Sequence, residues 1–384
     1  MALLARQALQ IRAWTLHVLA GQPAPPRLAA GVRSWDPLAW RCVLDVERCA
    51  LPLQARLDTS GMITQLPRSV AELLRARAVG EMQRVRMATR QLNELGAAAA
   101  KAGISLVVLE GGVAALDAAH PVDLDKLDLL VPGVVAREMA VAAESLGYRA
   151  IGEPGADRLA PRTRPSSFAL EIHLTTHSSG EALDADSWSR VRPIPGAPGL
   201  SQLGGAEQLM YVVERSAVDD PQRRGSVRDL LLAGQAVLRC SQSELEQVRR
   251  WVQGHPSSTA LRAVIALARS LQQGRVSADG LAQVAATNYL MHGLADSATF
   301  PQELRVSMGD CVSALIGGRG GHRRLWEATW SPKPRPRRRE YSTLERTAPT
   351  FHRGWSVSRQ LGHLAASYAA SCTLMGAARV LREV

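Results

Sequence analysis

The hydrophobic residues of this chain change their spacing near two glycines. Before Gly103, apolar residues recur at helical spacing, most clearly over residues 70–102. Residues 104–109 are then a short β-rich run that is apolar except for Ser105, which is typical of a buried strand. Helical spacing returns after Gly204. The sequence therefore predicts an α+β protein in which a central sheet is flanked by helical regions on both sides.

Three segments are predicted to form neighbouring strands of one sheet. They cover residues 104–109, 127–131 and 168–174. In the third segment, apolar side chains alternate with Glu171 and His173, which is the two-residue period of a strand with one buried face. These two polar side chains are therefore expected to share one face of the sheet.

Helices are expected on both sides of this sheet. The clearest one covers residues 70–102, where Ser69 and Glu72 match a capping box and Gly103 stands where a glycine commonly follows a helix. The remaining predicted elements are a short strand at 148–151, one or two helices at 36–57, and helices at 3–19, 134–146, 206–217, 227–238, 244–252, 259–272, 279–294 and 356–382.

These patterns divide the chain into four regions. Residues 1–100 form an N-terminal helical region, and residues 101–200 contain the strands of the core. Residues 201–330 form a C-terminal helical region. Residues 331–384 are expected to form a basic, proline-rich linker and a terminal helix.

Composition excludes several classes of protein. Hydrophobic residues make up 46% of the 384 residues, which is enough for a buried core and excludes a globally disordered chain. The apolar run at residues 1–20 is broken by Arg6, Arg12 and His17, so it predicts an amphipathic helix and not an export signal. No uncharged apolar stretch reaches the length of about 20 residues that a membrane span needs. The five scattered cysteines have no CxxC spacing, so we expect a cytoplasmic protein with reduced thiols.

Positive charge is concentrated near the C-terminal end of the chain. The whole sequence has 46 Lys and Arg against 35 Asp and Glu, and residues 301–384 have 14 against 6. The run from Arg337 to Arg339 follows Trp326 and Trp330, and basic side chains beside aromatic ones can hold nucleic acid. A solvated Pro/Arg-rich linker explains the same run without a ligand. Both weak nucleic-acid binding and a plain linker remain interpretations of this segment.

The residues that carry chemistry lie on and between the predicted strands. The strand at 104–109 is followed by Gly111 and Gly112, where a helix begins. Glycines let a backbone approach a phosphate closely, and the first N–H groups of a helix attract anions. Asp128 lies on the next strand and Glu171 on the third. Carboxylates on adjacent strands beside a Gly-Gly turn offer the oxygen ligands that Mg²⁺-assisted nucleotidyl transfer requires.

The order of these motifs resembles the bacterial family of uncharacterised nucleotidyltransferases, in the superfamily that includes DNA polymerase beta. The resemblance covers roughly residues 70–255 and depends on the ordered set of motifs, since no single one is specific. The matching segments are the strand and turn at Gly103–Gly111, the strand at Lys126–Val131, the helix end at Gly147-Tyr148, the strand at Leu170–His173 and the pair Arg228-Asp229.

Two positions depart from the pattern of that family. Glu110 stands where the family has lysine, and Lys126 stands where it has the first aspartate of an Asp-x-Asp pair. Asp125 would face the other side of a regular strand unless a bulge turned it round, and Asp123 is a further spare carboxylate. A lysine at a ligand position would repel Mg²⁺ unless its side chain lay elsewhere. One hypothesis is that Glu110 and Lys126 form a salt bridge in a metal-free site.

The resemblance implies a nucleotidyltransferase-like mixed sheet as the core and a function for its residues. An active protein would transfer NMP from an NTP to an unknown acceptor, such as a peptide or small molecule. Gly111 and Gly112 would bind the nucleotide, Asp128 and Glu171 would be catalytic, and Asp128, Asp125 and Glu171 would hold Mg²⁺. Two alternatives stay open. The chain could be a catalytically inactive relative that acts as a binding or scaffold protein, or it could bind nucleic acid through the basic C-terminus.

Overall fold

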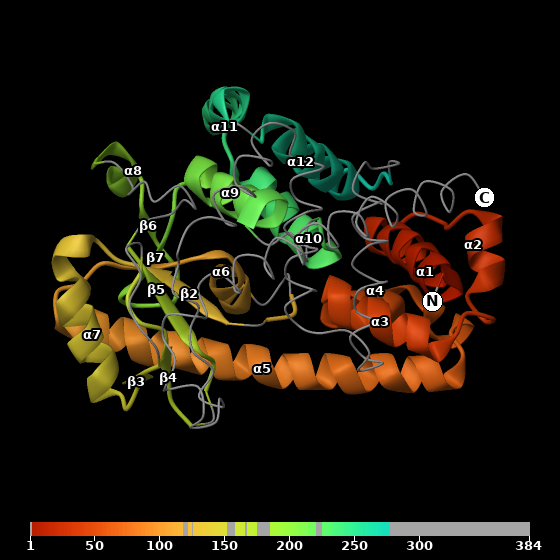
Figure 1. Cartoon of the computed structure of the whole chain (residues 1–384), viewed down its shortest axis with the longest axis horizontal. Helices are drawn as coiled ribbons and strands as arrows, with labels where there is room; N and C mark the ends of the chain where they lie inside the picture. The colour runs from red at the N-terminus through yellow and green to blue at the C-terminus, as the bar shows by residue number, and fades with distance from the viewer. Residues whose placement is uncertain are drawn as a thin grey trace, which may run out of the picture.

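The computed structural model describes residues 2–117, 122–124, 126–151, 158–165, 167–174, 185–219, 225–255 and 257–276. In this part of the chain a mixed sheet of seven strands is combined with many helices, which confirms the α+β class in its coarse form. Helices at the start of the chain form one end of the molecule and the sheet lies at the other (Figure 1).

The N-terminal helices pack around tryptophan side chains. They are α1 (Ala2–Ala20), α2 (Pro26–Gly31), α3 (Pro37–Glu47) and α4 (Ala50–Ser60). Trp14 and Trp40 meet edge to face, with ring centroids 5.4 Å apart. The predicted helix at 3–19 is confirmed. The segment at 36–57 forms two helices, because Arg48 adopts a left-handed conformation (φ 46°) that ends α3.

Helix α5 (Arg68–Lys101) runs along the lower edge of the molecule in Figure 1. The predicted capping box at its start is wrong, since Pro67 is the N-cap residue and Ser69 lies inside the first turn. Proline holds an extended backbone just before the helix (φ −53°, ψ 143°), and its missing N–H costs nothing there. Glu72 pairs with Arg68 instead, at 2.8 Å.

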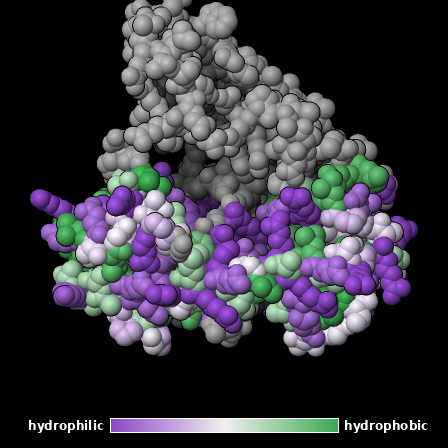
Figure 2. All heavy atoms as spheres, turned by 90° about the horizontal axis from the view of Figure 1, so that it is seen from below, coloured by the Kyte–Doolittle hydropathy of each residue, from purple (hydrophilic) through white to green (hydrophobic). Residues whose placement is uncertain are grey.

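The C-terminal end of α5 is as the sequence predicts. Gly103 has a φ of 69°, and the N–H of Ile104 donates to the carbonyl of Ala99 at 2.9 Å. Figure 2 views the molecule from the side on which α5 lies, and hydrophobic residues are scattered there among hydrophilic ones. The described residues seen in this view are therefore mainly polar, with scattered hydrophobic ones.

The three strands predicted to be neighbours are neighbours. The strands are β1 (Leu106–Val108), β2 (Leu127–Leu130), β3 (Arg149–Ala150), β4 (Arg162–Thr163), β5 (Leu170–His173), β6 (Arg192–Pro193) and β7 (Leu200–Gln202). Their order across the sheet is β3-β4-β5-β2-β1-β7-β6. β2 runs antiparallel to β1 and parallel to β5. The sequence analysis missed β4, β6 and β7, although β7 pairs directly with β1.

The structure has most of the helices predicted after the first strand, together with a short helix at 185–189 that the sequence did not predict. They are α6 (Glu110–Leu116), α7 (Ala136–Ser145), α8 (Ala185–Ser189), α9 (Gly205–Glu214), α10 (Val227–Arg239), α11 (Gln242–Gly254) and α12 (Ser258–Gln272). α9 continues as a π-helical turn over Arg215–Asp219. The predicted helices at 279–294 and 356–382 and the basic linker lie outside the described residues. None of the helices in the described part of the chain is long and apolar enough to cross a membrane.

One apolar core joins both helical regions to the sheet. Gly96 lets α5 approach the segment before β7, because a Cβ there would meet the carbonyl oxygen of Pro198 at 2.8 Å. Buried Arg12 of α1 pairs with Glu47 at 3.1 Å, and the Glu47 carboxylate accepts the N–H of Val227 at the start of α10. The sheet is thus held between helices from both ends of the described chain, and the four-region division stays a prediction.

Candidate functional site

Two carboxylates face each other across neighbouring strands. The parallel register of β2 and β5 places Asp128 directly opposite Glu171. Leu127 and Leu129, which flank Asp128, are fully buried in the core, so the two-residue period of a strand puts Asp128 on the other face of the sheet. The sequence prediction that the sheet brings Asp128 and Glu171 together is confirmed.

Asp128 is buried and surrounded by cationic and donor groups. Its Oδ1 lies 3.0 Å from Nε2 of His173 and 3.3 Å from Nζ of Lys126. Its Oδ2 accepts from the guanidinium of Arg215 at 2.5 Å. Burial by itself would raise the pKa of Asp128, but Arg215, His173 and Lys126 outweigh it and hold that pKa well below its usual value. Asp128 is therefore a fixed negative charge throughout the physiological range.

Glu171 is more accessible and lies against two cations. Its Oε2 is 2.5 Å from Nζ of Lys126 and 3.3 Å from Nη1 of Arg158. The Lys126 side chain is 25% exposed and that of Arg158 is 43% exposed, against 4% for Asp128. Lys126 therefore sits between the two carboxylates on the open side of the cluster.

The predicted salt bridge between Glu110 and Lys126 is wrong. The Glu110 carboxylate instead lies 2.7 Å from Arg215 and 3.5 Å from Arg228, both through Nη1. Glu110 is buried at the start of α6 and has a left-handed backbone (φ 43°). Lys126 directly precedes β2 and pairs with Glu171 and Asp128 instead. Lys126 and Asp128 are two residues apart, so their side chains lie on the same face of the sheet. The Glu110 site and the Lys126 site are thus linked through Arg215 and Asp128.

Gly111 and Gly112 lie in the first turn of α6, as predicted, and both are buried. A Cβ on Gly111 would lie 2.9 Å from Nη2 of Arg228, and a Cβ on Gly112 would lie 2.5 Å from Cγ1 of Val108. Close packing therefore accounts for both glycines. A role for Gly111 and Gly112 in nucleotide binding stays a prediction from the family resemblance.

Arg215 is a site residue that the sequence analysis missed. It begins the π-helical turn after α9, and one guanidinium nitrogen contacts both Glu110 and Asp128. Burial opposes its charge, but the two carboxylates dominate and raise the pKa of Arg215 further above its usual value. Arginine is frequent in this chain, and no local motif distinguishes this one. Short π-helical segments are frequent at functional sites, but they give no clear sequence signal.

The sequence offers two further carboxylates close to Asp128, at positions 123 and 125, and the structure describes only the first. Asp123 lies away from the cluster, where its carboxylate accepts the N–H groups of Ala50 and Leu51 at the start of α4. Burial raises the pKa of Asp123 to about 6. It is a capping group and not a ligand. Asp125 lies outside the described residues, so its predicted place as a metal ligand is untested.

Three side chains could hold a metal ion. Asp128, Glu171 and His173 each offer one ligand atom, and these atoms lie within 4.8 Å of one another. His173 belongs to the predicted β5 pattern, but the sequence analysis gave it no ligand role in this cluster. The set combines two carboxylate oxygens with one imidazole nitrogen.

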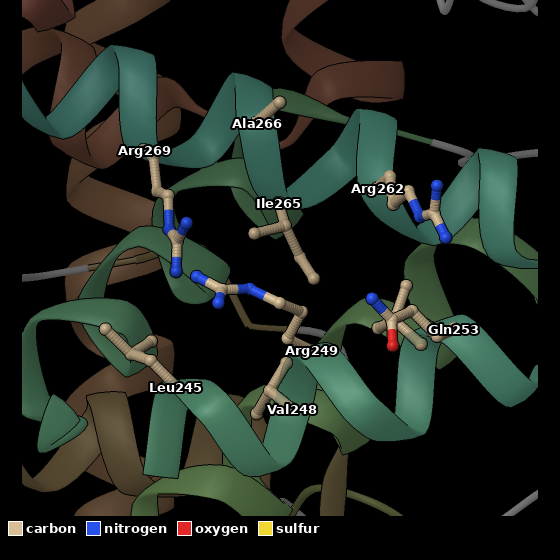
Figure 3. Close-up of a pocket in the computed structure, with 9 residues that line it drawn as sticks. Leu245, Val248, Arg249, Gln253, Arg262, Ile265, Ala266 and Arg269 are labelled. Carbon is tan, nitrogen blue, oxygen red and sulfur yellow. The ribbon is translucent and has the colours of Figure 1, made fainter. Parts of the chain in front are cut away.

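A hollow lies in another region of the described chain, away from these residues in sequence. It has a volume of about 360 Å³ and lies between α11 and α12, with side chains from both helices pointing into it (Figure 3). Its floor is apolar, with Val248 and Ile265, and Arg249, Arg262 and Arg269 lie around it. None of the residues of the carboxylate cluster lines this groove.

The fold and the cluster define an α+β protein with paired carboxylates on one face of a mixed sheet. The family model described as "Uncharacterised nucleotidyltransferase" matches residues 34–272, which is more than half of the chain. The chain belongs to this nucleotidyltransferase family. The match includes every residue of the carboxylate cluster, and it extends into the N-terminal helices beyond the resemblance seen in the sequence. No curated protein and no solved structure matches the chain.

Proposed function

We propose that this chain transfers a nucleoside monophosphate from a nucleoside triphosphate to an acceptor, which we expect to be a peptide or small molecule. The observation that carries the proposal is the pairing of Asp128 with Glu171 beside the N-terminus of α6. Nucleotidyl transfer needs cations that neutralise the triphosphate and carboxylates that hold a metal ion. The cluster supplies both kinds of group.

One divalent ion fits the donor set of the described residues. Asp128, Glu171 and His173 offer three ligand atoms close together, and carboxylate oxygens suit Mg²⁺ or Mn²⁺. Such an ion, when bound, would polarise the phosphate under attack. The choice of Mg²⁺ as the ion and Asp125 as a further ligand stay part of the proposal.

The chain's own residues would bind and orient the substrate. Arg215 fixes the orientation of the Asp128 carboxylate and keeps it charged. Lys126 and Arg158 are the more exposed cations of the cluster, so they are placed to meet phosphate oxygens. The nucleotide-binding role of Gly111 and Gly112 stays part of the proposal, although the N–H of Gly112 already donates to the carbonyl of Leu109 at 3.0 Å.

Binding and turnover test the proposal separately. We expect the full chain to bind an NTP in the presence of Mn²⁺ or Mg²⁺, measured by calorimetry, and to release pyrophosphate when the acceptor is supplied. Asp128→Asn and Glu171→Gln should each weaken NTP binding at least about tenfold, which corresponds to about 1.4 kcal/mol. Asp58→Asn, on the exposed side of α4, is the matched control. Failure of the wild-type chain to bind any of the common NTPs would contradict the proposal.

A second candidate function is supported by the charges of the cluster. Each carboxylate is already paired with a cation of the chain, namely Lys126, Arg158 or Arg215. An inactive relative that acts as a binding or scaffold protein would keep such ion pairs. NTP binding that persists in EDTA, without pyrophosphate release in any acceptor mixture, would favour this candidate.

A further inference from the structure

The position of Lys126 points to the number of metal ions that this site can hold. Its ammonium group lies 2.5 Å from Oε2 of Glu171 and 3.3 Å from Oδ1 of Asp128. It therefore bridges the two carboxylates that face each other in the β2–β5 register. A cation that bridges two carboxylates in this way occupies the place that a shared metal ion would take.

The sheet itself requires a cation at this place. Like charges directly opposite each other on adjacent strands destabilise a sheet, and Asp128 and Glu171 are such a pair. Lys126 precedes Asp128 by two residues, so its side chain emerges on the same face. The sequence thus supplies a tethered positive charge between the two carboxylates.

The remaining oxygen of Asp128 is closed to a further ion. Its Oδ2 accepts from Arg215, which is also held by buried Glu110. A metal ion on that side would have to break a contact shared by two buried carboxylates, and breaking a buried ion pair is strongly destabilising. The ligand atoms left for an ion are therefore Oδ1 of Asp128, the carboxylate of Glu171 and Nε2 of His173, and an ion there would displace the contacts that Lys126 makes with both carboxylates.

We propose that Lys126 takes the place of one of the two cations of a two-metal site, so that each chain holds at most one divalent ion. Only the role of Lys126 toward a triphosphate rests on the proposed function, whereas the number of bound ions does not. Asp128, Glu171 and His173 would hold that single ion, and the partly exposed Lys126 side chain would then be placed to neutralise part of the triphosphate charge.

The test counts Mn²⁺ ions bound to the full chain, by the electron paramagnetic resonance signal of the free ion, without nucleotide. We expect Lys126→Asp, which restores a carboxylate at this position, to bind one Mn²⁺ more per chain than the wild type. Lys101→Asp makes the same charge change at the exposed end of α5 and should leave the count unchanged. Equal counts for the wild type and Lys126→Asp, or two ions on the wild type, would overturn the proposal.

A second variant keeps the test valid if Lys126→Asp folds poorly, as judged by circular dichroism. Lys126→Met removes the charge without adding a ligand, so it should raise Mn²⁺ affinity about tenfold at an unchanged count. Unchanged or weaker affinity would also overturn the proposal. NTP binding is measured in a separate titration, so a chain that binds no NTP would refute the proposed function and leave the ion count to decide this inference.

Discussion

Asp123 and Asp128 lie close together in the sequence and are almost equally buried, but their surroundings differ. Counted over the whole residue, the exposed fraction is 4% for Asp123 and 3% for Asp128. Asp123 accepts two neutral backbone N–H groups, whereas Asp128 contacts Arg215, Lys126 and His173. The pKa of Asp123 is raised by burial to about 6, and that of Asp128 is held well below its usual value.

This difference separates a structural carboxylate from a functional candidate. Neutral donors at a helix N-terminus only partly offset the loss of hydration, so the charged form of Asp123 is disfavoured. The cations around Asp128 more than offset its own loss of hydration, so the charged form of Asp128 is favoured. In this protein, the burial of a carboxylate alone therefore does not identify a functional site, whereas cationic partners around the carboxylate do. The following predictions test this distinction.

The largest effect is expected where a cation holds two buried carboxylates. Arg215→Met leaves Glu110 and Asp128 without their shared partner, and we expect the free energy of unfolding to fall by about 3–5 kcal/mol. Urea denaturation at neutral pH measures it. Arg86→Met, on the exposed side of α5, is the control. A loss below about 1 kcal/mol would show that the cluster is not a buried ion network.

Asp123 should make stability fall as pH rises. Its folded pKa of about 6 exceeds the ordinary value of 3.8, so its contribution is complete below about pH 4 and is lost as pH rises to about 6. A shift of this size corresponds to about 3 kcal/mol. Asp123→Asn cannot ionise, so the difference between wild-type and variant unfolding free energies should change by this order between pH 4 and 6. Parallel pH curves for the two proteins would contradict the environment described for Asp123.

Asp128 should show the opposite dependence. Its folded pKa lies below 3.8, so its stabilisation is present above about pH 4 and is lost as pH falls further. Asp128→Asn should lower the unfolding free energy at pH 7 by about 2–3 kcal/mol, because charge-assisted hydrogen bonds are lost. The loss should shrink on acidification in urea denaturation between pH 7 and 3. A loss of unfolding free energy that became larger as the pH falls would contradict the difference described between Asp123 and Asp128.

The smallest effect is expected at His173. Replacing it with alanine removes one hydrogen bond to Asp128, and we expect a loss of about 1–2 kcal/mol in thermal or urea unfolding. His173→Gln keeps a donor at a similar distance along the side chain and should recover part of this loss. Equal losses for the two variants would mean that His173 contributes by packing and not by its bond to Asp128.

Much of the fold follows from local patterns in the sequence. The helix that ends at Gly103, the strands that contain Asp128 and Glu171, and the alternation in β5 all reflect spacings of a few residues. The predicted capping box failed for a local reason as well, since Pro67 already determines where α5 begins. The strands β4 and β6 have only two residues each, too few to show a period.

The sequence by itself predicted that Asp128 and Glu171 lie on neighbouring strands, because alternation is encoded within each strand and the order of the motifs resembles that of the nucleotidyltransferase family. Only the tertiary structure decided which cation meets which carboxylate. Arg215 reaches Asp128 across 87 residues of sequence, and Lys126 reaches Glu171 across 45. The Arg215 contact depends on how α9 packs against the sheet, and the Lys126 contact depends on the register of β2 and β5. Ion pairs act through distance in space, which residue spacing does not reveal. For the same reason, Glu110 pairs with Arg215 and Arg228 and not with Lys126.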